Sequence, residues 1–290
     1  MLPELPEVET VRQTLRTKIL DKSIKAVDIL YEPIIKTDLS HFKQTIINQT
    51  INEIERRGKY ILIKLDDHYL ISHLRMEGKY YIRNSLHETS KHEHVIFHLD
   101  DGTQLRYHDV RKFGTMHLKS LEEVHIGEPL EKLGYEPHDE LLTFSYLKPK
   151  LKKSKRPIKT ALLDQTIIAG LGNIYVDEVI FLSKLHPEQS ADSLSDRDIK
   201  QIIQASKQVI IKAIKLGGTT IRSYTSEEGV HGRFQNELTV HMRKDEPCIT
   251  CKETIIKMKV GGRGTYICPN CQKIKKKRNR KTSTKRTEHE

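Results

Sequence analysis

The stretch CITCKETIIKMKVGGRGTYICPNC, residues 248–271, contains all four cysteines of the chain. They form two Cys-x2-Cys pairs, Cys248 with Cys251 and Cys268 with Cys271, separated by sixteen residues. Two such pairs can supply four thiolates to one tetrahedral Zn²⁺, and the segment between them is long enough for a β-hairpin. Because a closed four-sulfur site leaves no position for water, we expect one structural zinc ion. Two disulfides are the alternative, which a cytosolic chain without other cysteines disfavours.

The composition indicates a soluble protein with a polyanionic partner. The 290 residues include 50 Lys and Arg against 39 Asp and Glu, a formal net charge of +11, which suits nucleic acid or an anionic membrane surface. Mean hydropathy is −0.57, yet aliphatic residues are spread along most of the chain, which excludes wholesale disorder. We find no apolar run of about 18–20 residues and no secretory leader, so we expect a cytosolic protein without a membrane span.

Most of the positive charge lies at the C-terminus. Residues 273–290 contain nine Lys and Arg and two Glu, a net +7, which leaves +4 for residues 1–272. Ile274 is the one aliphatic residue of this tail, so it cannot bury enough apolar surface to offset its ordering entropy, and we expect it to be disordered. A solubilising role and a DNA-tethering role both remain open.

The first 130 residues have a β pattern after one helix. Residues 6–20 read as an amphipathic helix, with Pro6 in the first turn and apolar residues on one face. Several short strand-like runs at close spacing are typical of a β-sandwich or barrel. The runs are 24–31, 51–56, 59–65, 69–74, 79–83, 94–99 and 103–108.

The periodicity becomes helical in the second half. After Gly134 and a lysine-rich linker at 148–159, we expect helices over 158–168, 174–185 and 196–216, the last with Ser195 as N-cap. The predicted fold class is α+β and multi-domain. The predicted domains are an N-terminal β-sandwich catalytic domain at 1–133, a linker and helical DNA-binding domain at 134–236, a zinc finger at 237–272 and a basic tail at 273–290.

An acidic segment precedes the first helix of this otherwise basic protein, Pro3-Glu4-Leu5-Pro6-Glu7. Carboxylates at a nucleic-acid surface weaken binding unless they have a function. Glu7 and Glu9 complement the positive end of the helix dipole. Glu4 has no such explanation and is the better candidate for chemistry.

Seven short segments follow one another along the chain: PELPEVET (3–10), ERRGKY (55–60), HLRMEG (73–78), DVRKFG (109–114), GLGNIYVDE (170–178), GGTT (217–220) and GRGTYICPNC (262–271). Together with the cysteine spacing they resemble bacterial formamidopyrimidine-DNA glycosylases, also called 8-oxoguanine-DNA glycosylases. The resemblance covers residues 3 to about 272 and leaves the tail out. It implies a β-sandwich with an N-terminal helix, a helix-two-turns-helix domain and a zinc β-hairpin. It also implies a cytoplasmic, bacterial, monomeric DNA-repair enzyme associated with the nucleoid.

This family implies a bifunctional glycosylase and lyase. Such an enzyme excises 8-oxoguanine and formamidopyrimidines from double-stranded DNA through a Schiff base, and it nicks the abasic site by β,δ-elimination. Its nucleophile, the amine of an N-terminal proline, maps to Pro3, and the adjacent acid/base carboxylate maps to Glu4. A terminal amine with a pKa near about 8 has more neutral form at physiological pH than a lysine near about 10.4. Lys59 matches the proton donor in β-elimination, and Arg263 matches the arginine of δ-elimination and phosphate contact.

The chain departs from the family at its start, which reads Met1-Leu2-Pro3 rather than Met-Pro. A proline within the chain is a tertiary amide without a nucleophilic lone pair. We hypothesise that translation starts at the Leu2 codon, read as methionine, so that processing exposes Pro3.

The resemblance also implies the DNA-binding residues. A wedge fills the space of the extruded base, and other residues contact phosphates and strands. They map to Met76, Arg111 and Phe113 for the wedge, His92 and Asn173 for phosphate, and Lys155 and Lys159 for strand contacts. Core packing of Met76 and Phe113 and a solvated Arg111 are the alternatives. Glu178 is either a carboxylate near the active site or a buried structural partner, and the loop 222–234 is expected to cover the extruded base.

Three other functions remain open. An endonuclease VIII-type enzyme would prefer oxidised pyrimidines. A damage-binding protein without catalysis would result if Pro3 is not the mature N-terminus. A general zinc-ribbon nucleic-acid binder would account for residues 248–271 and the tail, but not for the first 130 residues.

Overall fold

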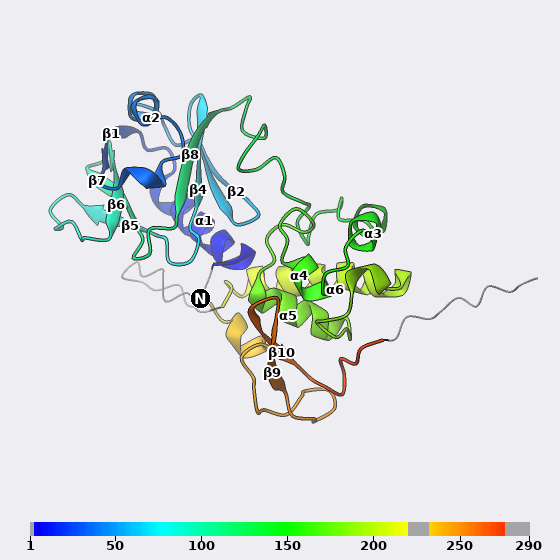
Figure 1. The fold of residues 1–290 in the computed structure, drawn as a ribbon. Coiled ribbons are helices and arrows are strands. Elements are labelled where there is room, and N and C mark those ends of the chain that lie inside the picture. The colour runs from blue at the N-terminus through cyan, green and yellow to red at the C-terminus, as the bar shows by residue number, and fades with distance from the viewer. Residues whose placement is uncertain (1–2, 220–231, 276–290) are drawn as a thin grey trace, which may run out of the picture.

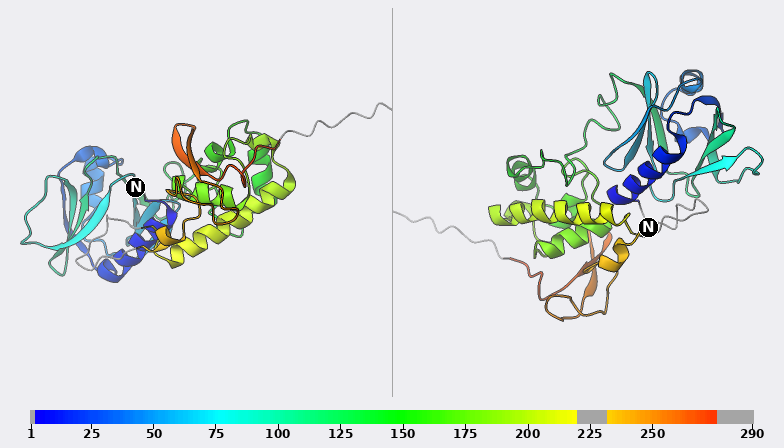
Figure 2. Two further views of the ribbon diagram at one scale, coloured as in Figure 1. Left: turned by 90° about the horizontal axis from the view of Figure 1, so that it is seen from below. Right: turned by 180° about the vertical axis from the view of Figure 1, so that it is seen from behind.

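The computed structural model describes residues 3–219 and 232–275. A β lobe and a helical lobe lie side by side, and a small hairpin extends from the helical lobe (Figure 1). Helix α1 (Leu5–Ile19) lies along the β lobe and contacts both β2 and α6 (Figure 2). The N-terminal segment therefore lies where the two lobes meet.

Two four-stranded antiparallel sheets form the β lobe. One has the order β1 (Ile24–Ile29), β6 (Glu93–Leu99), β7 (Thr103–His108) and β5 (Lys79–Asn84). The other has the order β2 (Glu53–Arg57), β3 (Tyr60–Lys64), β4 (His68–His73) and β8 (Thr115–Ser120). Side chains of both sheets and of α1 share one apolar core, which includes Val11, Leu15, Ile61 and Phe97. The predicted β-sandwich with an N-terminal helix is confirmed.

Two elements of this lobe, strand β8 and helix α2, were not predicted from the sequence. Strand β8 alternates buried Met116 and Leu118 with more exposed neighbours, the period-two pattern of a strand with one face in the core. Helix α2 (Leu39–Ile46) is one short amphipathic helix, with Phe42 and Ile46 buried and Asp38 as its N-cap. Eight residues are too few for a clear helical period.

The helical lobe consists of α3 (Phe144–Lys152), α4 (Ile158–Leu162), α5 (Asn173–Leu182) and α6 (Asp196–Lys215). Short 3-10 turns occur at Glu32–Ile34, Ala191–Ser193 and Phe234–Glu237. The predicted linker at 148–159 is wrong in its first part, because α3 buries Leu147 and Leu151 and its lysines are the polar face. Helix α4 also ends earlier than predicted. Ser195 caps α6 as predicted, accepting a hydrogen bond from Asp198 N at 3.2 Å.

The hairpin pairs β9 (Ile256–Val260) with β10 (Arg263–Ile267) in antiparallel register. Gly261 and Gly262 connect the strands with φ of 54° and 78°. Two successive positive φ values are the requirement of a type I′ turn, which glycine meets without strain. The predicted hairpin between the cysteine pairs is confirmed.

The beginning of the predicted tail is attached to the helical lobe. Lys275 N donates to Gln189 Oε1 at 2.8 Å, and Lys275 Nζ pairs with Asp198 at 2.5 Å. The basic residues beyond Lys275, 276–290, lie outside the described residues. Within the described part of the chain, none of the helices has the length and apolar character needed to cross a bilayer.

Candidate active site and DNA interface

The side chain of Glu4 lies at the N-terminus of α5. Its Oε1 accepts a hydrogen bond from Ile174 N at 3.0 Å and its Oε2 one from Tyr175 N at 3.5 Å, and the residue is 2% exposed. The positive end of a helix favours a carboxylate at this position. The adjacent Pro3 is also buried.

Two glycines of GLGN make this placement possible. A Cβ on Gly172 would lie 2.2 Å from Glu4 Cδ, and one on Gly170 would lie 2.4 Å from Leu5 Cδ1. Gly170 has φ of +96°, and its carbonyl accepts a hydrogen bond from Leu5 N at 3.1 Å. The chain start can therefore approach α5 closely because these two positions have no side chain.

Burial raises the pKa of Glu4 to about 7, although the positive charge of Lys59 and the N–H of Ile174 lower it. A carboxyl group with such a pKa can both give and take a proton near neutral pH. This is the behaviour required of an acid/base group.

Lys59 lies in the turn between β2 and β3 and is half-buried. Burial lowers its pKa, the charges of Glu4 and Glu7 oppose this shift, and Arg263 adds to it. A Cβ on Gly58 would lie 3.5 Å from Ala169 Cβ, so the turn reaches the helical lobe next to Gly170. The structure thus brings Glu4, Lys59 and the hairpin residue Arg263 into one electrostatic neighbourhood.

Glu7 belongs to this site, although its place in the sequence indicated only an interaction with the helix dipole. Its Oε2 accepts from Glu4 N at 2.9 Å, and its Oε1 accepts from Tyr175 Oη at 2.5 Å and Thr219 N at 2.8 Å. A Cβ on Gly218 would lie 2.6 Å from Glu7 Oε1, which explains the second glycine of GGTT. The GGTT motif marked this position in the sequence. Its contact with Glu7 forms only when the chain has folded and could not be predicted from the motif.

The segment after Thr219 begins at this carboxylate. A Cβ on Gly232 would lie 2.4 Å from Gly218 O, so the two ends of the segment meet. Residues 222–231 of the predicted covering loop 222–234 lie outside the described part of the chain. Its described end continues into Phe234, which is buried in the helical core.

A protein carboxylate occupies the N-terminus of α5, where Asn173 lies. The N–H groups of Ile174 and Tyr175 bind the Glu4 carboxylate, so the anion at this helix terminus is a side chain of the protein. Asn173 is half-buried and its Nδ2 donates to Gly264 O at 3.0 Å. A phosphate contact by Asn173 itself stays a prediction.

Lys159 is not available for the predicted contact with a DNA strand. Its side chain is 0% exposed, and its Nζ donates to Asp177 Oδ1 at 2.6 Å and to Gly264 O at 3.1 Å. The cause is the burial of Asp177, which requires a cation beside it. Lys155 is exposed, as a strand contact requires.

Glu178 is a structural partner, the second of the two alternatives. It is buried and accepts hydrogen bonds from Thr239 N, Val240 N and His241 N at 2.8, 3.0 and 2.9 Å. It therefore attaches the segment that precedes the zinc finger to α5.

The loop from Asp109 to Gly114 presents an aromatic ring and a cation to the surface. The buried Asp109 carboxylate accepts from the backbone N–H groups of Arg111, Phe113 and Gly114 at 2.9 to 3.0 Å. Phe113 is 50% exposed, and the Arg111 guanidinium lies 4.8 Å from the centre of its ring. Core packing of Phe113 is therefore wrong, and the exposed pair has the properties of a wedge.

Met76 and His92 are intermediate in solvent exposure. Met76 lies in the connection from β4 to β5 and is half-buried, which leaves both of its alternatives open. His92 is also half-buried, and its ring lies 5.5 Å from that of His108. His92 as a phosphate contact stays a prediction.

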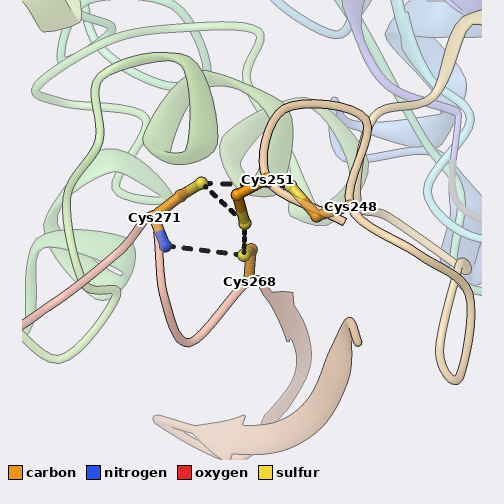
Figure 3. A group of neighbouring side chains, drawn as sticks. All are labelled: Cys248, Cys251, Cys268 and Cys271. Carbon is orange, nitrogen blue, oxygen red and sulfur yellow. Dashed lines mark hydrogen bonds between the residues drawn. The ribbon is translucent and has the colours of Figure 1, made fainter. Parts of the chain in front are cut away.

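The four cysteines converge at one point (Figure 3). All four Sγ atoms lie within 4.8 Å of one another and none forms a disulfide. Thr250 N lies 3.4 Å from Cys248 Sγ and Cys271 N lies 3.5 Å from Cys268 Sγ, so the backbone also orients the sulfurs. Four converging thiols fit a tetrahedral zinc ion, and the expected structural zinc site is confirmed.

Three family models together match most of the chain. The family model for the formamidopyrimidine-DNA glycosylase N-terminal domain matches residues 2–116, and that for the H2TH domain of the same enzymes matches residues 133–225. The model for a zinc finger found in FPG and IleRS matches residues 245–274.

Similar proteins extend over nearly the same length. Formamidopyrimidine-DNA glycosylase from Bacillus subtilis is 50% identical over 275 residues, 93% of this chain and 99% of the relative. The enzyme from Oceanobacillus iheyensis is 47% identical over 273 residues, 93% of this chain and 98% of the relative.

Two solved DNA complexes have the same fold. Lactococcus lactis Fpg with DNA containing an abasic site has a TM-score of 0.86 at 42% identity and covers 93% of this chain and 100% of that one. MutM with DNA containing carbocyclic 8-oxo-G has a TM-score of 0.86 at 43% identity, with coverage of 93% and 99%.

Proposed function

The chain belongs to the formamidopyrimidine-DNA glycosylase family, and on this basis we propose that it excises oxidised purines from duplex DNA and then nicks the abasic strand. The lesions are 8-oxoguanine and formamidopyrimidines, and the nick forms by β,δ-elimination. The observation that carries the proposal is the buried Glu4, whose pKa is raised to about 7 beside the start of the chain.

The first step is nucleophilic. The Pro3 amine forms a bond to C1′ of the damaged nucleotide while the bond from C1′ to the base breaks. The C1′–O4′ bond then breaks, O4′ takes a proton, and the resulting iminium of the opened sugar is the Schiff base. Glu4 gives or takes the protons of this step, because both of its forms are present near pH 7. The contact of Glu4 N with Glu7 and the close approach of Gly170 to Leu5 support a rigid placement of Pro3.

The elimination steps use two cations from different lobes. Lys59 supplies the proton in β-elimination, when the 3′ C–O bond breaks, and its lowered pKa makes its proton easier to donate. Arg263 lies exposed at the start of β10 and stabilises the phosphate that departs in δ-elimination. The zinc ion holds the hairpin that carries this arginine and takes no part in the reaction.

Recognition requires that the damaged nucleotide leave the duplex. Met76, Arg111 and Phe113 fill the resulting space, and the exposed ring of Phe113 with its adjacent guanidinium supports this role. His92, Lys155 and Asn173 contact the DNA backbone. The protein acts as a monomer on double-stranded DNA that contains an oxidised purine or an abasic site.

Pro3 can be the nucleophile only as the first residue of the mature chain. We propose that Leu2 is decoded as the initiating methionine and removed. The intact mass of the native protein tests this directly. A mass that retains Met1 and Leu2 together with full lyase activity would refute the assignment of Pro3.

Borohydride trapping on an abasic duplex tests the chemistry. We expect a covalent adduct that is lost when the terminal amine of Pro3 is blocked by acetylation, and its absence from natively processed protein would favour a damage-binding protein without catalysis. Comparing excision from 8-oxoguanine:cytosine and thymine-glycol duplexes tests the lesion. Faster excision of thymine glycol would favour the endonuclease VIII-type alternative.

A further inference from the structure

One buried carboxylate, Asp177 of α5, attaches the β9–β10 hairpin to the helical lobe. It is 1% exposed. Its Oδ1 accepts from Lys159 Nζ at 2.6 Å, and its Oδ2 lies 2.8 Å from His241 Nδ1 and accepts from Tyr266 N at 3.3 Å. Asp177 therefore connects α4, the segment before the zinc finger, and strand β10.

The connection continues to the residue next to Arg263. Lys159 Nζ, held by Asp177, donates to Gly264 O at 3.1 Å, and Asn173 Nδ2 donates to the same oxygen at 3.0 Å. Two donors from the helical lobe thus hold the Gly264 carbonyl, one residue after Arg263. Since Asn173 begins α5, the helix whose N-terminus binds Glu4, one helix positions both the acid/base carboxylate and the hairpin backbone.

Stability alone does not account for this arrangement. Desolvation of a buried ion pair offsets much of its attraction, and a well-packed apolar pair is often at least as stable. A charged pair with further hydrogen bonds restricts its partners to one geometry. The restricted partner here is the Gly264 carbonyl, and the functional residue beside it is Arg263.

We propose that Asp177 is a positioning residue which, through Lys159 and the Gly264 carbonyl, sets the place of the Arg263 guanidinium and so controls δ-elimination. This inference rests on the proposed function, because that function assigns Arg263. In δ-elimination a proton leaves the opened sugar and the 5′ C–O bond breaks, so the phosphate departs with the electron pair. A guanidinium stabilises that charge only from a well-defined position.

The main test is the full-length, zinc-loaded Asp177→Asn variant on an abasic duplex. We expect the ratio of β,δ product to β product to fall by about tenfold or more, because small displacements of a catalytic group can cost up to about a hundredfold in rate. Single-turnover excision of 8-oxoguanine and zinc content should stay unchanged. An unchanged product ratio in the folded variant would overturn the inference.

Glu178→Gln is the matched control. Glu178 is the next residue of α5 and equally buried, but it binds the backbone of Thr239 to His241 and not the hairpin. We expect it to change thermal stability without changing the product ratio. An equal change of the ratio in both variants would indicate a general loss of packing and contradict a specific role of Asp177.

A double-mutant cycle separates action through Arg263 from other effects. In an Arg263→Gln background, Asp177→Asn should reduce δ-elimination no further. If Asp177→Asn alone leaves the buried Lys159 charge unpaired and does not fold, the paired variant Lys159→Met with Asp177→Asn removes both charges. We expect the same altered ratio from it, and a wild-type ratio would refute the inference.

The same cycle is also measured as affinity for a duplex with a tetrahydrofuran abasic analogue, which cannot form a Schiff base. Asp177→Asn should weaken binding when Arg263 is present and have no further effect in Arg263→Gln. Additive losses would overturn the inference even if the wild-type protein forms no trapped adduct. The absence of that adduct would refute the proposed lyase chemistry. The affinity for the tetrahydrofuran duplex would still show whether Asp177 positions Arg263.

Discussion

Glu4 Oε1 lies 3.0 Å from the amide nitrogen of Ile174, so a carboxylate from the start of the chain occupies the N-terminus of α5. Residues separated by 170 positions thus form one unit. The helix terminus stabilises the charged form of Glu4 and burial stabilises the neutral form, and burial is the larger effect. The result is a carboxyl group poised near neutral pH.

We predict that Glu4→Gln makes the protein more stable at alkaline pH. The pKa of Glu4 rises from 4.5 to about 7 on folding, so folding favours its protonated form. The corresponding stability is fully present below pH 4.5, declines as pH rises, and is lost above about 7, a difference of about 3 kcal/mol at most. Glutamine has no proton to lose.

Thermal unfolding between pH 4.5 and 8 measures this effect. The stability difference between Glu4→Gln and the wild type should grow with pH, while excision activity is lost. The exposed Glu122→Gln is the control and should show no such trend. A pH-independent difference for Glu4→Gln would contradict a raised pKa.

Gly172→Ala should abolish excision with little effect on zinc content. The new Cβ would lie 2.2 Å from Glu4 Cδ, so the carboxylate must leave the N-terminus of α5. We expect a loss of at least about a hundredfold in single-turnover excision. Gly172 has φ of −134°, which alanine adopts without strain, so the expected effect is steric. Gly102→Ala, with no atom within 4 Å of the added Cβ, is the control for a glycine substitution that meets no neighbour. Comparable losses in both variants would refute the steric explanation.

Phe113→Ala should impair lesion excision without destabilising the fold. The ring is 50% exposed, so its removal should change the free energy of unfolding by no more than about 0.5 kcal/mol. Leu141→Ala, at 56% exposure in the helical lobe, is a matched apolar control. Single-turnover excision should fall about tenfold or more in Phe113→Ala alone, and wild-type excision would eliminate the wedge role.

Zinc removal should abolish δ-elimination. The four cysteines pack against Phe181 and Val240, so loss of the metal releases a small core together with the hairpin. Elemental analysis should give one zinc per chain and none in Cys268→Ser. Activity should fall on chelation and return when zinc is added back, and full δ-elimination without zinc would exclude a role of the metal in placing Arg263.

Deletion of the tail should reduce nonspecific DNA binding. Because Lys275 is attached to Gln189 and Asp198, the deletion begins at residue 276 and removes seven Lys and Arg and two Glu. The slope of log K against log salt should flatten by about 0.9 for each phosphate that the tail neutralises in the full-length protein. Single-turnover excision should change little. An unchanged slope would show that the tail does not bind phosphates.

Local patterns were enough to predict much of the fold. Short strand-like runs marked seven of the eight strands of the sandwich, and the cysteine spacing marked the zinc site and its hairpin. The helix at 144–152 was missed because its surface lysines dominate a short sequence whose buried face is only Leu147 and Leu151. The buried side of α3 is recognised only once α6 is packed against it.

The motifs indicated the candidate site residues, but the environment of each side chain depends on the assembled lobes. Lys159 and Lys155 lie in one basic stretch, yet one is fully buried against Asp177 and the other is exposed. Glu4 and Glu7 lie in the same acidic segment, but their environments differ. Glu7 accepts hydrogen bonds from Thr219 and Tyr175, whereas Glu4 lies at the N-terminus of α5.

Residue type and spacing along the chain specify the zinc ligands, the strands and the family, because these depend on neighbours in sequence. Three features arise only when α1, α4, α5 and the hairpin meet. They are the raised pKa of Glu4, the burial of Lys159 and the two hydrogen bonds to the Gly264 carbonyl. Desolvation and hydrogen bonding act through space, and that is why the protonation and placement of these groups follow from the folded chain.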